Sequence, residues 1–279
     1  MKSYEYFVLL SLLFLVSCSC GNERSYEAQI SGDLPIASDG RSVLRLATYN
    51  VGVFNKSGVN SLAMVSRMMK EWAPDVISLN ELDSCNTRSG LDVYQLSDFA
   101  KAMGNWNYHF ASAIPYKDGT YGIGVVTPMP VKNKWNIRLP QADDREVRAL
   151  AVVETDRFVF CSTHIGLTEA ARLAQVDVIN EFISSHFMNY GKPVFLCGDM
   201  NDVPSGNAIN RLKGDWTLLS CTDEYTYNTT MPKKCIDYIF MYKHAASCTP
   251  VSTKVGTSFR SGDPKVASDH FPVLVEVRL

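Results

Sequence analysis

Acidic, amide and imidazole side chains recur in this sequence at the ends of apolar runs, where a side chain leaves the core and can face a cleft. Those that stand out are Asn50, Glu81, His164, Asp199, Asn201, Asp237, Asp269 and His270. Any one of them, taken alone, is more commonly a turn or helix-cap residue. As a set they contain only Asn, Asp, Glu and His, without a serine-nucleophile motif or a phosphate-binding glycine loop. The set therefore points to chemistry that these four residue types perform together.

Oxygen ligands of this kind suit Mg²⁺ or Mn²⁺, which bind proteins through a few carboxylates, water and a substrate phosphate. A phosphate ester is anionic and water attacks it slowly. Its hydrolysis needs a cation to offset charge, a base to orient the water and a stabilised leaving oxygen. A histidine held by an aspartate can transfer protons near neutral pH, because the carboxylate fixes its tautomer. We therefore predict hydrolysis of a phosphate ester with Mg²⁺ (or Mn²⁺) as the cofactor.

The elements that must position these side chains alternate between strands and helices. Helices are predicted near 61–72, at 91–103 and after an N-cap at Thr168. Strands are predicted at 43–50, 76–81, 106–111, 123–127, 135–139, 147–154, 158–164, 193–197, 216–219, 236–241 and 272–278. Several consecutive strands lack an intervening helix, so a purely parallel doubly wound sheet fits poorly. Two packed sheets flanked by helices fit better.

The order of the segments that carry these residues resembles a known family. The segments are Thr48-Tyr49-Asn50, Pro74-Asp75-Val76-Ile77 leading into Asn80-Glu81, Tyr121-Gly122-Ile123-Gly124, Arg148-Ala149-Leu150, Ser162-Thr163-His164, Gly198-Asp199-Met200-Asn201, Ile236-Asp237-Tyr238-Ile239 and Ser268-Asp269-His270-Phe271-Pro272. With them the sequence resembles the endonuclease/exonuclease/phosphatase superfamily, which has the deoxyribonuclease-I-like fold. Any one tripeptide is common by chance, but the ordered set is specific. The resemblance implies an α/β fold, a four-layer sandwich of two mixed β-sheets flanked by helices, with the active site at one edge between the sheets.

The resemblance also implies a metal centre. Glu81 looks like the family's principal metal ligand, with Asn50 and Asp269 near the metal or its water molecules. The residue before Glu81 is Asn80, where the family usually has glutamine. A second departure is Thr127-Pro128, which stands where the family usually has Ser-Arg.

The catalytic roles come from the same resemblance. Asp199 and Asn201 would position the nucleophilic water and the phosphate. His270, oriented by Asp237, would contact the scissile phosphate, and His164 would be a phosphate ligand or a general acid toward the leaving oxygen. Whether Asp199 or His270 takes the proton from water stays open at this point.

Two further residues match family positions near the phosphate, and we predict that they bind substrate. They are Tyr121 and Arg148. The structural alternative for Tyr121 is an ordinary tyrosine before a strand glycine. For Arg148 it is a strand-edge arginine that forms an ion pair. Lys233 and Lys234 precede the strand at 236–241 and are predicted to be a solvated pair, with contact to a substrate phosphate as the alternative.

Composition and charge limit the range of functions. The 279 residues are 46% hydrophobic and 20% charged, which excludes a disordered tail and a multi-span membrane protein. The formal net charge of -2 argues slightly against processive nucleic-acid binding, which rests on Lys and Arg. Nucleic acid, phospholipid, and sugar or inositol phosphate all stay open as substrates of a monomer. The alternative from another class is a non-catalytic surface lipoprotein that uses the same fold to bind a partner.

The N-terminus reads as an export signal. Lys2 precedes an apolar run at 6–16, which is short for a membrane span and is followed by Ser17 and Cys18 in the manner of a bacterial lipobox. We predict a lipoprotein signal peptide at 1–17, a flexible tether at 18–41 and a catalytic domain at 42–279. Cys18 would then carry a lipid that anchors the exported protein to a membrane of a bacterial envelope. An ordinary cleaved signal peptide is the alternative.

Six cysteines follow Cys20 and show no Cys-x-x-Cys pair, so a zinc knuckle is not expected. Cys161 and Cys197 lie in apolar runs and are predicted to be buried thiols. A disulfide is allowed among Cys221, Cys235 and Cys248, because an exported protein meets an oxidising compartment.

Overall fold

The computed structural model describes residues 43–279. The predicted signal peptide at 1–17, the predicted tether at 18–41 and the predicted lipidation site Cys18 lie outside the described residues. Within 43–279, no helix combines the length and the apolar character that a membrane span requires.

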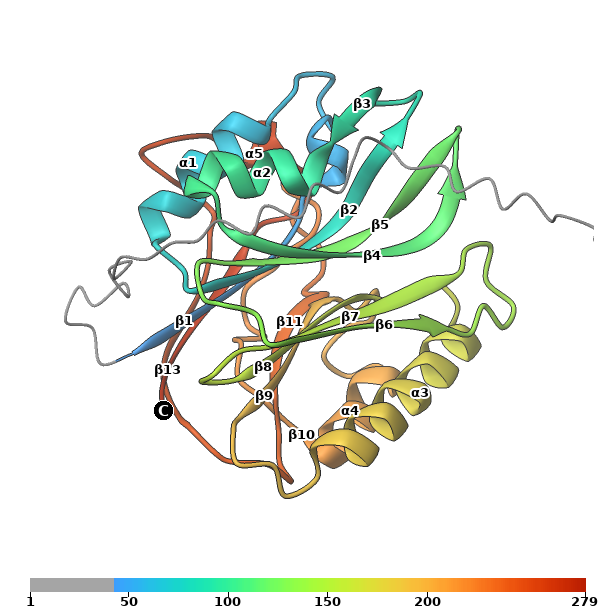
Figure 1. Cartoon of the computed structure of the whole chain (residues 1–279), viewed down its shortest axis with the longest axis vertical. Helices are drawn as coiled ribbons and strands as arrows, with labels where there is room; N and C mark the ends of the chain where they lie inside the picture. The colour runs from blue at the N-terminus through green and yellow to red at the C-terminus, as the bar shows by residue number, and fades with distance from the viewer. Residues whose placement is uncertain (1–42) are drawn as a thin grey trace, which may run out of the picture. The chain divides into compact units, whose positions relative to one another are not determined.

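Two mixed β-sheets face each other in this part of the chain (Figure 1). The first sheet has the order β12 (Thr249–Val255), β13 (Val273–Arg278), β1 (Leu44–Asn50), β2 (Val76–Asn86), β5 (Gly119–Thr127) and β4 (Asn107–Tyr116), and β3 (Gly90–Tyr94) pairs with β2. The second sheet has the order β10 (Trp216–Leu218), β11 (Asp237–Tyr242), β9 (Val194–Asp199), β8 (Val159–His164), β7 (Arg148–Glu154) and β6 (Asn133–Leu139). β1 pairs in parallel with β2, and β8 pairs in parallel with β9. These parallel pairs bring polar strand ends together at one edge.

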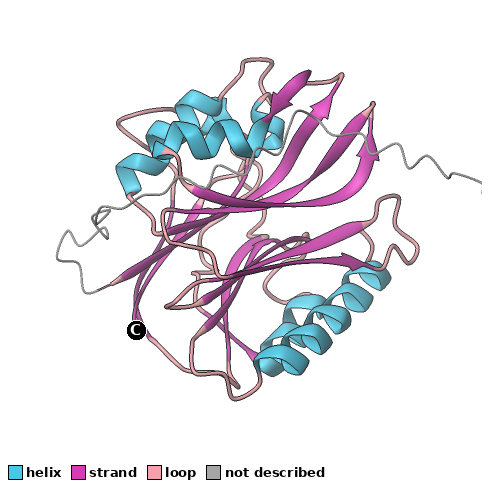
Figure 2. Cartoon of the chain, viewed as in Figure 1, coloured by secondary structure: helices cyan, strands magenta, loops and turns pink. Residues whose placement is uncertain are grey.

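Helices cover the outer face of each sheet, which gives the four layers that the sequence predicts (Figure 2). The helices α1 (Leu62–Trp72), α2 (Gln95–Gly104) and α5 (Pro264–Ala267) lie on the first sheet, whereas α3 (Glu169–Phe187) and α4 (Asn207–Asp215) lie on the second. α1 forms because Val65, Met68, Met69 and Trp72 recur at helical spacing and are all buried. α3 begins where Thr168 Oγ1 accepts a hydrogen bond from the Ala171 backbone N–H at 3.2 Å.

Three apolar clusters hold the layers together. The central cluster fills the space between the sheets with Leu46, Val125, Phe160, Phe195 and Ile239 among its buried members. The other two clusters lie between each sheet and its helices. Burial of this apolar surface is the main term that fixes the distance between the sheets. That distance sets the width of any site at their shared edge.

Several predicted elements differ from the observed ones. β2 does not end at Glu81 but continues to Asn86, and residues 91–94 of the predicted helix belong to strand β3. The reason is a local hairpin: the extension of β2 offers backbone groups to β3, which follows it directly, and α2 then begins at Gln95. α4, α5 and β12 were not predicted from the sequence.

The cysteines in the described residues follow the prediction in part. Cys161 and Cys197 are buried free thiols in β8 and β9. Cys221, Cys235 and Cys248 are also free thiols, so no disulfide joins any two of them. Their polar surroundings permitted a disulfide, but the fold does not form one there.

Candidate active site

A pocket of about 410 Å³ opens at the edge where the two sheets meet. Its lining includes predicted residues from both sheets: Glu81, Tyr121, Arg148, His164, Asp199, Asn201, Asp269 and His270. The two other predicted residues, Asn50 and Asp237, lie directly behind this lining, since Asn50 hydrogen-bonds Glu81 and Asp237 hydrogen-bonds His270. The structure therefore brings every predicted residue between 50 and 270 into one place.

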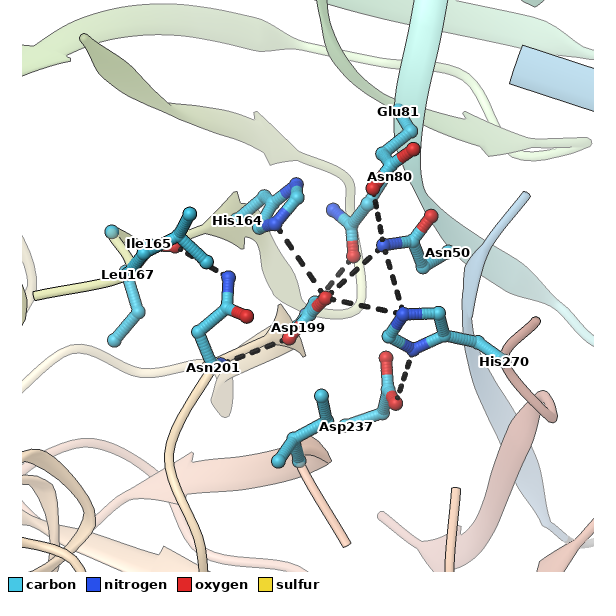
Figure 3. Close-up of polar contacts among 12 residues, drawn as sticks. Asn50, Asn80, Glu81, His164, Ile165, Leu167, Asp199, Asn201, Asp237 and His270 are labelled. Atoms are coloured by element: carbon cyan, nitrogen blue, oxygen red, sulfur yellow. Dashed lines mark hydrogen bonds and ion pairs between the residues drawn. The ribbon is translucent and has the colours of Figure 1, made fainter. Parts of the chain in front are cut away.

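Asp199 lies at the centre of the polar groups (Figure 3). Its Oδ2 accepts a hydrogen bond from Asn50 Nδ2 at 3.1 Å. The same oxygen lies 3.5 Å from His164 Nε2 and 3.6 Å from His270 Nε2. Burial and the nearby Asp237 carboxylate raise the pKa of Asp199 to about 7. A carboxylate with this pKa can accept a proton near neutral pH.

The backbone around Asp199 is fixed by two residues that sequence reasoning left without a role. Gly198 has φ 143°, and a Cβ there would come 1.8 Å from the Thr163 carbonyl oxygen, so only glycine fits between β8 and β9. Asn80 bridges the two sheets: its Oδ1 accepts from the Asp199 backbone N–H at 3.0 Å, and its Nδ2 donates to the Thr163 carbonyl at 3.0 Å. The asparagine that departs from the family pattern thus sets the position of the central carboxylate.

Glu81 reaches the pocket because β2 is irregular at this residue. The pairing of β2 with β5 shifts between Leu79 and Leu82, and Glu81 has φ 58° in the left-handed region. A bulge of this kind redirects a side chain out of the regular alternation. Asn50 then holds the carboxylate, since its Nδ2 donates to Glu81 Oε1 at 3.1 Å while its Oδ1 accepts from the Gly52 backbone N–H at 3.2 Å.

His270 and Asp237 form a buried pair. The ring Nδ1 donates to Asp237 Oδ2 at 2.9 Å, and both side chains are at most 5% exposed. Burial alone lowers the pKa of His270, but the Asp237 and Asp199 carboxylates outweigh burial and raise it to about 10. The ring is therefore an imidazolium at neutral pH, and its Nε2–H points toward Asp199 and the pocket.

His164 has the opposite electrostatic character. Burial lowers its pKa well below the usual value, and the Arg148 guanidinium lowers it further. Arg148 Nη1 lies 3.5 Å from His164 Nδ1, and an arginine can only donate, so Nδ1 is the acceptor and Nε2 carries the hydrogen. His164 is thus a neutral N–H donor whose Nε2 faces the centre of the site. Arg148 is itself 5% exposed, with an ion pair to Glu146 at 3.3 Å.

Tyr121 lines the pocket and lies beside an arginine. The Arg88 guanidinium lies 4.3 Å from the centre of the Tyr116 ring and 5.4 Å from that of Tyr121. Asp83 fixes that guanidinium through two hydrogen bonds of 2.8 and 2.6 Å. The Tyr121 ring therefore belongs to a rigid wall of the pocket.

The carboxylates of the pocket fit a hard divalent cation. Asp269 Oδ1 is buried and has no hydrogen-bond partner among the described residues, and the same is true of Asp237 Oδ1. Asp269 Oδ2 accepts from Lys56 Nζ at 2.9 Å, so a cationic group already occupies that side. A buried carboxylate oxygen without a donor is costly unless a cation meets it. The donor set is rich in oxygen, as Mg²⁺ and Mn²⁺ require.

Comparison with known proteins identifies the fold family. The family model described as "Endonuclease/Exonuclease/phosphatase family" matches residues 47–270, which include every pocket residue named above. The chain belongs to the endonuclease/exonuclease/phosphatase family. Members of this family are phosphoesterases, and membership supports a phosphate-ester hydrolase. No curated protein sequence matches the chain.

Solved structures show the same family fold at low sequence identity. An endonuclease/exonuclease/phosphatase from Bacteroides vulgatus has a TM-score of 0.69 at 17% identity over 86% of this chain and 100% of its own. A mannosyl-6-phosphatase from Bacteroides thetaiotaomicron has a TM-score of 0.68 at 19% identity over 85% and 100%. The human Nocturnin catalytic domain with bound sulfate has a TM-score of 0.64 at 17% identity over 84% and 93%.

Sequence reasoning missed several residues that line the pocket of this family member. They are Lys56, Glu146, Leu167, Tyr227, Lys234 and Ile236. Lys234, for which solvation was the prediction and contact with a substrate phosphate the alternative, is exposed and also lines the pocket. Tyr227 lies against the His270–Asp237 pair, with its ring centre 4.9 Å from that of His270. Most of these side chains come from loops, and no local pattern marks a loop residue as close to a distant strand end.

Proposed function

We propose that this chain is a divalent-metal-dependent phosphoesterase in which water attacks the phosphorus directly. The observation that carries the proposal is the single pocket in which Asp199, neutral His164 and the His270–Asp237 pair meet the carboxylates of Glu81 and Asp269. A base, two N–H donors and oxygen ligands in one place are the parts that phosphate-ester hydrolysis needs.

Glu81 and Asp269 are the residues that would hold the metal, with Asn50 positioning Glu81. Asp199, Asp237 and His270 also bring ligand atoms within 4.8 Å of one another. We favour the first pair because Glu81 and Asp269 both line the pocket, whereas Asp237 lies behind the lining and its Oδ2 accepts from His270 Nδ1. That Asn50 contributes an oxygen ligand stays a prediction, since its Oδ1 accepts from Gly52. When bound, the ion would offset charge on the phosphate and on the leaving oxygen.

Asp199 is the group that we assign as the proton acceptor. His270 is protonated at neutral pH and cannot take a proton from water, whereas Asp199 has its pKa raised to about 7. The water oxygen would attack phosphorus, its proton would pass to Asp199, and the bond from phosphorus to the leaving oxygen would break. The leaving oxygen would take up a proton from the site or from solvent. No covalent intermediate is required.

The remaining polar groups would hold the phosphate. The His270 imidazolium and the neutral His164 both direct an Nε2–H at the centre of the site and can donate to phosphoryl oxygens. Asn201 Nδ2 donates to the Ile165 carbonyl at 2.9 Å, which leaves its Oδ1 to accept a hydrogen bond from the attacking water. Arg148 and Tyr121 line the same pocket and can contact the substrate.

The proposal is tested by hydrolysis of bis(4-nitrophenyl) phosphate with Mg²⁺ or Mn²⁺. Turnover should disappear on treatment with EDTA and return when the metal is restored. Glu81→Gln should weaken the metal affinity, measured by calorimetry, at least about tenfold, because even groups outside the coordination shell have effects of that size. Glu181→Gln, on the exposed face of α3, is the matched control and should bind metal as the unaltered chain does. Equal metal affinity in both variants would contradict the assignment of Glu81.

A panel of natural substrates then separates the possibilities within the family. Plasmid DNA, RNA, phosphoinositides, sphingomyelin and sugar phosphates each present a phosphate ester in a different setting. A folded, metal-binding chain that hydrolyses none of them, nor the aryl ester, would favour the alternative of a non-catalytic surface lipoprotein.

We also propose that the chain is exported and lipidated at Cys18. Support comes from the apolar run at 6–16 and the small residue before that cysteine. On expression in a bacterium, the unaltered chain should carry a lipid mass at its N-terminus and partition with membranes. Cys18→Ser should lose both properties, whereas the control Cys20→Ser should keep them. A lipid that persists in Cys18→Ser would rule out this site.

A further inference from the structure

A second hollow, of about 270 Å³, adjoins the active-site pocket and shares Lys56 and Asp269 with it. We call it the adjoining hollow. Besides these two residues, its wall contains Lys265 and the polar side chains of Asn228 and Thr230. A substrate bound in the pocket can therefore extend into the adjoining hollow past Lys56.

The walls of the adjoining hollow are tied to the catalytic segment. Ser57 Oγ donates to the Val266 carbonyl at 2.8 Å. Thr229 donates twice to the same segment, from its backbone N–H to the Asp269 carbonyl at 3.0 Å and from Oγ1 to the Ser268 carbonyl at 2.9 Å. Both loops that form the hollow are thus fixed to the residues just before His270. The hollow keeps a constant place beside the reacting centre, as a substrate subsite requires.

The charge of the adjoining hollow favours an anion. Two ammonium groups, of Lys56 and Lys265, face one carboxylate among its lining residues, that of Asp269. Lys56 Nζ already pairs with this carboxylate at 2.9 Å. The neutral amide and hydroxyl groups of the wall can donate hydrogen bonds to a phosphate. A second negative group of a substrate would meet net positive charge here.

The ion pair of Lys56 with Asp269 contributes little to the stability of the fold. The side chain of Lys56 is 44% exposed, and that of Asp269 is 17% exposed. Ion pairs of such exposure contribute little to folding stability. The same ammonium can contribute more to binding a phosphate, because hydrogen bonds between oppositely charged groups are stronger than those between neutral groups. The position of Lys56 between the two hollows therefore matters more for substrate selection than for stability.

We propose that Lys56 and Lys265 form a second anion subsite, which binds a phosphate that the substrate carries beside the scissile phosphate. The inference deepens the proposed function and rests on it. The shared chemistry is a compound with two neighbouring phosphate groups, on a nucleotide or on a polyol such as inositol. A compound with a single phosphate would use the active-site pocket alone.

The test measures the dissociation constants of two matched ligand pairs by calorimetry on the full chain with Mg²⁺. One pair is thymidine 5′-phosphate and thymidine 3′,5′-bisphosphate, and the other is inositol 4-phosphate and inositol 4,5-bisphosphate, whose two phosphates lie on adjacent ring carbons. In one of the pairs, the second phosphate should tighten binding at least about tenfold, which is the effect of one charged hydrogen bond. The pair that shows the gain identifies the scaffold.

The variants locate the gain in the adjoining hollow. Lys56→Gln and Lys265→Gln should each reduce it to about twofold or less. Lys132→Gln, on the exposed chain after β5, is the control and should keep the full gain. Lys56 forms an ion pair with Asp269, the proposed metal ligand, so Lys56→Gln could also alter metal binding. Lys265 does not form this ion pair, so an altered metal site cannot explain a loss of the gain in Lys265→Gln. The absence of a gain in both pairs, or a gain that survives in both variants, would overturn the subsite.

The outcome is separable from that of the proposed function. Hydrolysis of bis(4-nitrophenyl) phosphate, which has one phosphate, reports on the active-site pocket alone. Turnover of this ester without any gain from a second phosphate would remove the subsite and leave the phosphoesterase intact. Tighter binding from the second phosphate without turnover of any ester would support the subsite and contradict the proposed phosphoesterase activity.

Discussion

Replacement of Asp199 by asparagine should lower kcat for bis(4-nitrophenyl) phosphate by about 10³-fold or more, in the range that loss of a general base produces. Asparagine has nearly the same shape and can still accept the hydrogen bond from Asn50 Nδ2, but it cannot take a proton from water. A loss of 10³ corresponds to roughly 4 kcal/mol of transition-state stabilisation. KM should change much less, because the phosphate contacts of His164 and His270 remain.

The pH profile gives the same prediction an independent readout. Activity that needs the ionised Asp199 should rise with pH through the pKa of this group, which burial and Asp237 raise to about 7. A dication in the pocket favours the ionised carboxylate, so the rise should occur at or below that value in the loaded enzyme. In Asp199→Asn the rise should be absent from whatever activity remains.

A matched control separates chemistry from folding. Asp177 is an exposed aspartate on α3 that pairs with Arg211 on α4, remote from the pocket. Asp177→Asn should keep its kcat within about twofold, as most surface substitutions change little. The contrary outcome is that Asp199→Asn keeps more than about a tenth of the activity and shows the same rise of activity with pH as the unaltered chain. The general base would then have to be another residue.

The site was largely predictable because its chemistry lies at strand ends. Asn50, His164 and Asp199 each end a strand, and the parallel pairs β1–β2 and β8–β9 bring such ends to one edge. Local sequence marks where a buried strand stops, since apolar alternation gives way to polar residues. The meeting of these ends follows from the pairing of strands, which the order of family motifs indicated.

The backbone conformation at Glu81 could not be predicted from the pattern of apolar residues. Glu81 lines the pocket, but β2 does not end there, and a bulge turns the side chain into the pocket. The sequence does hold a trace of the bulge: Leu79 and Leu82 are both fully buried in the same cluster although they are three residues apart, which breaks the period of two. A single break of this kind is equally typical of a strand end.

Lys56 and Tyr227 show a different limit. Both reach the pocket from loops. The loop of Lys56 is held by the hydrogen bond from Ser57 Oγ to the Val266 carbonyl, and the loop of Tyr227 by that from the Thr229 N–H to the Asp269 carbonyl. Each loop is thus placed by a segment that is distant in the sequence. No periodicity records such a contact, because loop side chains carry no regular spacing relative to the core. The loop residues that line the pocket are therefore the part of the site that required the structure.

Removal of the imidazolium in His270→Ala should lower kcat/KM by roughly 10³-fold, and at the least by a hundredfold, since it removes a charged donor aimed at the phosphate. The Asp237 and Asp199 carboxylates raise the pKa of His270 to about 10, so its charged form is lost as pH rises through that value. Activity that depends on the imidazolium should therefore fall at alkaline pH. This alkaline limb should be missing in His270→Ala.

Asp237 acts through His270, and its variant distinguishes a positioning role from a merely structural one. Asp237→Asn removes the carboxylate that accepts from His270 Nδ1 at 2.9 Å, so the pKa of His270 should fall and the alkaline limb should move to lower pH. A defect in folding alone would lower activity without moving this limb.

A double-mutant cycle completes the test. Measured at a pH where Asp199 is ionised in every variant, so that the effect of Asp237 on its pKa drops out, Asp237→Asn/His270→Ala should be within about twofold of His270→Ala alone, as expected for residues that act as a unit. Multiplicative effects of the two substitutions would mean that each residue contributes separately, and the buried pair would then lose its assigned role. Among the described residues, Asp237 Oδ1 has no donor, and Asp237 Oδ2 accepts from His270 Nδ1. The side chain of Asp237 therefore makes its hydrogen bond to His270, which is the physical reason to expect the non-additive result.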